Sequence, residues 1–336
     1  MKTLLAFVIC LIPQLSPAYP SGLYSPDGAS TPINIAYDQT GIPGNWRIEE
    51  QGAGRDWVVD GLAGHNLPTT VYTTAGAIRV RPLDWAVKVF TWGLKHQQFN
   101  GSYLCNDPYH SASFFVEKLC YAILLLKKSP FASEYAVFIN TANRLNYKTA
   151  LWMSLPSIYN TYKGEEEQYG HRYWLDGAAL LLTEVLNPDA INPGANLLRQ
   201  AYLFFDHGFS AQLPNGVNVE DGGYDSSYQG VGLYFATVAY NYIPDTTRTD
   251  ATQKAKMYRM LSLGEAWEAS RIESDGTVNL SGNTRVTGNC TETDPNGICK
   301  TVAWSSIADS FGNWSVISGD KHCADLAGLV RIEYGE

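Results

Sequence analysis

The chain has 336 residues and a formal net charge of −9, from 33 acidic and 24 basic side chains. This charge argues against a nucleic-acid partner, which would require a basic face to meet its phosphates. Beyond the first residues, no stretch of about 18 residues runs without polar interruption, so we expect no membrane anchor.

The start of the chain has the pattern of a secretory signal peptide. Lys2 is followed by an apolar run from Leu4 to Ile12, and then by Ser16-Pro17-Ala18, a small-x-small ending typical of signal peptidase sites. We therefore expect residues 1–18 to be removed and the protein to be secreted into an extracellular setting. Residues 19–336 contain no Pro/Ser-rich hinge, low-complexity tract or charge block, which predicts a single domain and, we expect, a monomer.

The composition predicts an all-α fold with irregular ends. Between residues 19 and 82, Gly, Pro, Asn and Thr dominate, which predicts an irregular N-terminal arm with little regular helix. Apolar residues at helical spacing then predict helices over residues 83–97, 112–127, 134–151, 171–186, 197–207, 229–242 and 252–271. Residues 275–336 predict a loop-rich tail with one or two further helices, around 303–311 and 320–332, or a small sheet.

Several of these helices are apolar on more than one side, which a surface helix would not tolerate. The first example is the run Phe114-Phe115-Val116, which continues through Leu119 and Ile123. Such doubly packed helices favour one (α/α) toroid or barrel of about six or seven helical hairpins. The loops between them are rich in Trp, Tyr, Asn, Asp and His, which is typical of a sugar-binding cleft because flat rings cover the apolar faces of pyranoses.

Cysteines and sequons agree with export. Loss of Cys10 with the signal leaves Cys105, Cys120, Cys290, Cys299 and Cys323. Cys290 and Cys299 flank a turn-rich loop and form the first expected disulfide, while an odd number of thiols leaves the full connectivity open. Sequons at Asn100, Asn279, Asn289 and Asn313 either accept glycans or occur by chance.

The first candidate site is the segment Tyr169-Gly170-His171-Arg172-Tyr173-Trp174, at the start of an apolar helix. The helix dipole lowers the pKa of a histidine at this end, so His171 would stay neutral and be available as a base. A capping or packing histidine is the alternative, and the arginine and aromatic rings beside His171 argue against it.

The second candidate is the loop of residues 219–230, where Gly222 and Gly223 let the backbone turn sharply before a helix. The loop carries two tyrosines and three acids: Tyr224, Tyr228, Glu220, Asp221 and Asp225. Asp225 can cap the helix that follows. Capping does not explain why two of the acids precede the glycines.

Two further polar loops give weaker signals. Residues 281–288 hold Asn283 and Arg285 between glycines, and an arginine so placed can bind a carboxylate through two hydrogen bonds. Asn106 and His110 flank Pro108, where they either face the same cleft or cap the next helix.

His171-Arg172-Tyr173-Trp174, opening a helix, is similar to the His-x-Tyr-Trp element of (α/α)-toroid alginate lyases. The loop from Asp221-Gly222-Gly223 to Ser227-Tyr228 resembles the Asp-Gly-Gly…Ser…Tyr loop of heparinase-like and alginate lyases. Over about residues 83–285, the chain thus resembles (α/α)-class polysaccharide lyases, with the glucuronan and alginate lyases of family 38 as the nearest group. The resemblance implies an enzyme that cleaves a uronic-acid polysaccharide by β-elimination, without a metal or other cofactor.

The resemblance also implies roles for individual residues. The catalytic candidates are Tyr228, His171, Arg285 and Glu220. The substrate-binding candidates are Tyr224, Asp225, Arg172, Tyr173, Trp174, Asn283, Asn106 and His110. Tyr228 serves as both base and acid if the proton and the leaving oxygen lie on one face of the sugar; otherwise His171 is the base and Tyr228 the acid.

The chain departs from the family pattern at two positions. Gly170 stands where the toroid alginate lyases have an asparagine before the histidine, and Asp221 stands where they have an arginine. Neutralisation of the substrate carboxylate must therefore come from elsewhere, and Arg285, Arg172, Asn283 or a protonated Glu220 are the candidates. These departures leave the polymer open between glucuronan, alginate and another polyuronate.

Two other functions remain open from the sequence. A glycoside hydrolase on the same toroid would use Glu220, Asp221 or Asp225 as its acid and base. A secreted sugar-binding protein would use the aromatic rings alone.

Overall fold

The computed structural model describes residues 46–73, 76–188, 196–293 and 299–334. These residues are mostly α-helical, which confirms the all-α prediction. The sheet that they contain is a two-stranded antiparallel hairpin of β1 (Thr69–Thr73) and β2 (Gly76–Val80), in which Thr69 pairs with Val80. The predicted signal peptide lies outside the described residues.

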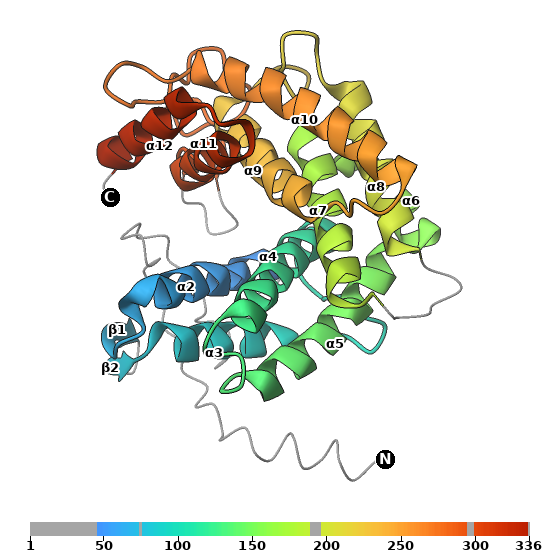
Figure 1. The fold of residues 1–336 in the computed structure, drawn as a ribbon, viewed down its shortest axis with the longest axis vertical. Helices are drawn as coiled ribbons and strands as arrows, with labels where there is room; N and C mark the ends of the chain where they lie inside the picture. The colour runs from blue at the N-terminus through green and yellow to red at the C-terminus, as the bar shows by residue number, and fades with distance from the viewer. Residues whose placement is uncertain (1–45, 74–75, 189–195, 294–298, 335–336) are drawn as a thin grey trace.

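Most helices pack in pairs that are consecutive along the chain. The pairs are α2 (Gly54–Asp60) with α3 (Pro82–Lys95), α4 (Pro108–Lys128) with α5 (Ala136–Met153), α7 (Gly170–Leu186) with α8 (Leu197–Ala211), α9 (Ser226–Tyr242) with α10 (Arg248–Ala269), and α11 (Trp304–Ser318) with α12 (Lys321–Tyr334). The first members, α2, α4, α7, α9 and α11, also pack each on the next, and we call them the inner row. Figure 1 shows the chain following a curve from α2 to α12.

Three helices of the inner row, α4, α7 and α9, are buried on most sides, as the sequence predicted. In α7 every residue from Gly170 to Thr183 is buried. Trp174 of this helix packs against Phe205 of α8, with ring centroids 6.3 Å apart. A helix covered on all sides can present ligand-binding groups only at its ends, which is where the candidate motifs lie.

Two segments differ from the sequence predictions. The expected irregular arm is helical between residues 48 and 65, where η1 (Ile48–Ala53), α2 and the π-helical turn η2 (Gly61–His65) follow one another. Residues Pro156–Glu166 form α6, which begins with proline at its first turn. Short or polar helices leave little periodic signal, because tertiary packing supplies most of their stability.

The C-terminal tail contains the predicted disulfide between Cys290 and Cys299, with Cα atoms 5.0 Å apart. Within the described part of the chain, Cys105, Cys120 and Cys323 are free thiols. The tail forms α11 and α12, as expected. Its described strand-like pairings, Ile272 with Val278 and Thr293 with Cys299, are isolated bridges and do not make a sheet.

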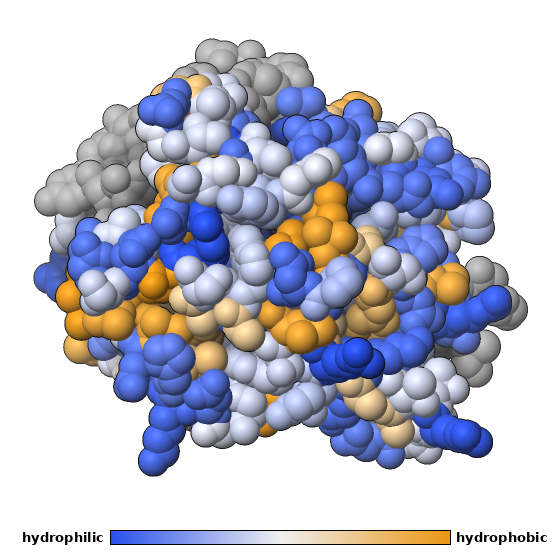
Figure 2. Space-filling model, turned by 90° about the horizontal axis from the view of Figure 1, so that it is seen from above, coloured by the Kyte–Doolittle hydropathy of each residue, from blue (hydrophilic) through white to orange (hydrophobic). Residues whose placement is uncertain are grey.

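The surface is mixed in character. Figure 2 shows hydrophobic residues on one face in separate groups between hydrophilic ones. Across the described ranges, no helix combines the length and the apolar character needed to span a bilayer. Of the sequon asparagines, Asn313 lies within α11, where its side-chain amide donates to Thr237 at 3.2 Å.

Candidate functional site

A cavity of about 660 Å³ lies where the first turns of α4, α7 and α9 come together with α6 and the loop after α10. Its lining is rich in charge. The cations are Arg47, Arg172, Arg285 and Lys300, the carboxylates are Glu49, Asp107, Glu165 and Glu292, and the tyrosines are Tyr162, Tyr169 and Tyr228. Such a lining suits a polar, charged ligand with rings stacked on its apolar faces.

The first turn of α7 and the glycine loop before α9 are joined through their backbones. Gly170 N donates to Val219 O at 2.8 Å, and Asp221 N donates to Gln168 O at 3.1 Å. Asp221 (φ 48°) and Gly222 (φ 77°) adopt the left-handed conformation that turns the loop back. This pairing brings the two sequence motifs, 49 residues apart at His171 and Glu220, into one site.

Gly170 is required by this close approach. A Cβ atom at this position would lie 2.7 Å from Val219 O, a backbone atom that cannot rotate away. The asparagine of the toroid alginate lyases therefore has no room here unless the loop shifts. The difference from the sequence pattern that the chain resembles thus has a steric reason at this position.

His171 is anchored by Glu220. Glu220 Oε1 accepts from the backbone N of His171 at 2.8 Å and lies 2.7 Å from its Nδ1. A carboxylate oxygen accepts only, so Nδ1 carries the hydrogen. Burial lowers the pKa of His171 despite the neighbouring carboxylate. The imidazole is therefore neutral, and its buried Nε2, an acceptor, has no hydrogen-bond partner among the described residues.

Tyr228 is the centre of the site. Its ring lies against the imidazole of His171, with centroids 4.8 Å apart. On the ring also lies the guanidinium of Arg285, with Cζ 3.7 Å from the centroid, and Lys300 Nζ donates to the phenol oxygen at 2.6 Å. The structure thus brings together Tyr228, His171 and Arg285, and it adds a second cation.

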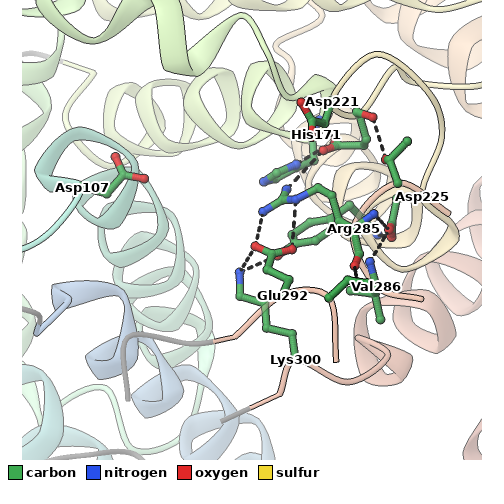
Figure 3. Close-up of polar contacts among 12 residues, drawn as sticks. Asp107, His171, Asp221, Asp225, Arg285, Val286, Glu292 and Lys300 are labelled. Atoms are coloured by element: carbon green, nitrogen blue, oxygen red, sulfur yellow. Dashed lines mark hydrogen bonds and ion pairs between the residues drawn. The ribbon is translucent and has the colours of Figure 1, made fainter. Parts of the chain in front are cut away.

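Glu292 lies between the two cations, as Figure 3 shows. Arg285 donates to it through Nη2 (2.6 Å) and Nε (3.1 Å), and Lys300 donates through Nζ (2.8 Å). On its other side Arg285 Nη1 reaches the buried Glu220 at 3.3 Å. Asp107 stands apart from this group in the same view, and it lines the cavity from the position just before α4.

The wall formed by α4, α6 and α7 holds a second charged cluster. Arg172 donates to Glu166 at 2.7 Å and to Asp107 at 2.9 Å. Burial raises the pKa of Asp176 to about 7, and burial also raises the pKa of Glu166. His110 lines this wall, and burial lowers its pKa well below the ordinary value, so it is neutral.

Seven sequence candidates do not line the cavity. Two of them, His171 and Glu220, are buried next to it, in contact with Tyr228 and Arg285. Asp225 caps α9 through Tyr228 N and accepts from the backbone N of Arg285 and Val286, so the predicted cap is confirmed. Asn283 binds Ser226 and Val286 O. Tyr224 donates to Ser281 O and packs beside Trp267. Tyr173 and Trp174 pack in the core. The polar atoms of Asp225, Asn283 and Tyr224 position the loops through these hydrogen bonds.

Sequence reasoning missed Glu292 and Lys300. Neither belongs to a motif, and both follow the disulfide cysteines closely: Glu292 by two residues and Lys300 by one. An antiparallel bridge between Thr293 and Cys299 sets them side by side, and Lys300 N donates to Glu292 O at 2.9 Å. The predicted disulfide was the feature that could have identified them, because it brings the residues next to Cys290 and Cys299 close together.

Comparison of the chain with known protein families, with curated proteins and with solved structures finds no match. The geometry of the cavity is therefore the basis on which a function can be proposed.

Proposed function

We propose that the chain is a secreted polysaccharide lyase that cleaves a uronic-acid polysaccharide of the glucuronan or alginate type by β-elimination. The observation that carries the proposal is the convergence of His171, Arg285 and Lys300 on Tyr228 at the wall of one cavity. A phenol needs cationic neighbours before it can act as a base near neutral pH.

The proposed architecture is an (α/α) toroid. The inner row and its outer partners form five hairpins in the described residues, fewer than the six or seven expected from the sequence. The cavity lies at the N-terminal ends of three inner helices, where the first turns of α4, α7 and α9 meet. This placement suits a polymer that crosses the end of the helical array.

The elimination follows from the chemistry of a uronate. The C5 proton is acidic enough to remove only when the adjacent carboxylate is neutralised, and Arg285 and Lys300 are the cations beside Tyr228. The phenolate of Tyr228 takes the C5 proton, the electron pair forms the C4–C5 double bond, and O4 departs. Tyr228 then returns the proton to O4, which completes the cleavage.

His171 packs against the ring of Tyr228 without lining the cavity itself. The imidazole is 1% exposed and held by Glu220, so Tyr228 is the better placed to touch a ligand in the cavity. A substrate whose C5 proton and O4 lie on opposite faces would instead use His171 as base and Tyr228 as acid. Glu220 acts in either case as a positioning residue for His171 and Arg285.

A glycoside hydrolase is the weaker proposal. Glu220 and Asp225 are fully buried and engaged by nitrogen donors, and Asp221 is exposed outside the cavity, where it accepts from Gln168 at 2.6 Å. None of these three carboxylates faces a sugar in the cavity. They are therefore poor candidates for an acid and base pair.

The test is to incubate the purified protein with a panel of polyuronates and to record the ultraviolet absorbance of unsaturated products. We expect absorbance to rise on at least one polymer, and Tyr228→Phe to lower the rate by a factor of about 100 or more, the range for a proton-transfer residue. Tyr258→Phe, an exposed tyrosine on α10, is the control. New reducing ends without absorbance would favour a hydrolase, and tight binding without products would favour a binding protein.

A further inference from the structure

The carboxylate of Glu292 has unusual surroundings for a residue on a loop. Two cations converge on it, and both of them also contact Tyr228, one over its ring and one at its hydroxyl. These four residues all line the cavity. A two-cation site beside the proposed base is therefore filled by a carboxylate of the protein itself.

The distances match those that a bound uronate would need. Glu292 Oε1 lies 3.5 Å from the hydroxyl oxygen of Tyr228. In a uronate, each carboxylate oxygen is two bonds from C5, the carbon that loses its proton. A substrate carboxylate in the place of Glu292 would thus put C5 close to the tyrosine oxygen, with both cations on the carboxylate.

We propose that Arg285 and Lys300 form the uronate-carboxylate subsite and that Glu292 occupies it in the unliganded protein as an internal competitor. The inference rests on the lyase function proposed above. Substrate binding then exchanges one carboxylate for another, and the loop that carries Glu292 must move its side chain out of the subsite.

The two carboxylates on Arg285 differ in their ability to leave. Glu220 is fully buried and also bound to His171, whereas the side chain of Glu292 is 25% exposed. When Glu292 leaves, Glu220 still balances the charge of Arg285. The charge of Lys300 is then free to pair with the incoming carboxylate, so the exchange leaves no uncompensated buried charge.

The experiment compares wild type with Glu292→Gln by calorimetric titration with D-glucuronate, and with D-glucose as the uncharged probe. We expect Glu292→Gln to bind glucuronate about tenfold more tightly, because the competing carboxylate is gone. Binding of glucose should not change. Glu134→Gln, which removes a carboxylate paired with Arg81 away from the cavity, should leave the affinity for glucuronate unchanged.

Glu292→Asp provides a second variant that keeps the charge but withdraws it by one methylene, and its affinity should also rise. Unchanged or weaker glucuronate binding in both folded variants overturns the inference, since Glu292 would then be a brace for the two cations. Tighter binding supports the subsite even if no polyuronate yields an unsaturated product, a result that would reject only the lyase. Product formation with unimproved glucuronate binding in both variants rejects only the subsite.

Discussion

Tyr228 experiences two opposing effects on its acidity. Burial raises its pKa, while Lys300 and Arg285 lower it, with burial the larger effect. In the unliganded protein the phenol is therefore protonated near neutral pH. If Tyr228 is the base, the rate of elimination should rise about tenfold per pH unit on the acidic side of its pKa.

Lys300→Met tests the contribution of the ammonium group. Without it the pKa of Tyr228 rises further, so we expect a rate about tenfold lower at pH 8. The deficit should stay constant on the acidic side of the wild-type pKa, where both rates rise about tenfold per pH unit, and should shrink only above that pKa, where the mutant rate still rises while the wild-type rate has levelled off. The measurement is the pH dependence of kcat/KM on the best polyuronate.

The matched control is Lys254→Met. Lys254 lies on the outer helix α10 and pairs with Asp245. Its profile should coincide with that of wild type. A Lys300→Met deficit that persists at a pH where both rates have levelled off would contradict a role in the acidity of Tyr228 and would indicate only a structural contact.

At the scale of elements, the start of α7 depends on a glycine. Gly170→Ala places a methyl group 2.7 Å from Val219 O and should lower the free energy of unfolding by about 1–3 kcal/mol. Gly164→Ala is the control within α6, since a methyl group there would meet no atom within 4 Å and alanine favours helix. We expect that change to be neutral or stabilising by about 0.5–1 kcal/mol. Urea denaturation of both variants measures the difference, and equal stabilities would refute the steric argument.

Helix α10 buries two acids, Glu265 and Glu268, behind the loop of Asp225. Burial raises the pKa of Glu265 to about 8, and burial followed by the charges of Glu265 and Asp225 raises that of Glu268. The folded state therefore holds more protons than the unfolded state between the ordinary pKa of 4.5 and the raised values. Their contribution to the free energy of unfolding is therefore largest below pH 4.5 and is lost as the pH rises through the raised pKa values.

Glu268→Gln replaces one of these acids with a neutral side chain that does not ionise as the pH rises. We expect the variant to melt several degrees above wild type at pH 8, with a difference that narrows toward pH 4. Thermal unfolding at four pH values measures this. Glu333→Gln, an exposed glutamate on α12, should run parallel to wild type, and a Glu268→Gln curve that did the same would show that the buried acid does not drive the pH dependence.

At the scale of the whole molecule, Arg55 joins elements far apart in the chain. From α2 it donates to Asp56 at 2.7 Å and to the hydroxyl of Tyr234 on α9, whose ring lies 4.9 Å from its guanidinium. Glu117 of α4 and Asp309 of α11 add attraction from two further helices. One largely buried cation thus links the N-terminal helices to the C-terminal half.

Arg55→Met should lower the free energy of unfolding by about 3–5 kcal/mol, because it leaves buried polar partners without their cation. Chemical denaturation gives the value. Arg199→Met on the exposed side of α8 is the control and should change stability by less than about 0.5 kcal/mol. A small effect of Arg55→Met would mean that the two halves are held by apolar packing alone.

Local pattern by itself determined much of this protein. The apolar period located helices such as α4, α7 and α9, the glycine loop predicted the cap at Asp225, and the short cysteine spacing predicted the disulfide. These features depend on residues within a few turns of one another, so the sequence contains them directly. The polar helix α6 and the short helix α2 were not predicted, because their stability comes from neighbours distant in the chain.

Only the tertiary structure decided the composition of the site. Lys300 lies 72 residues from Tyr228 along the chain, yet the two form one hydrogen bond. The same folding moved Asp225, Tyr224 and Trp174 away from the cavity, although they share its motifs. Periodicity specifies which face of a helix is buried, whereas the meeting of distant loops depends on how the helices pack and where the disulfide closes the chain.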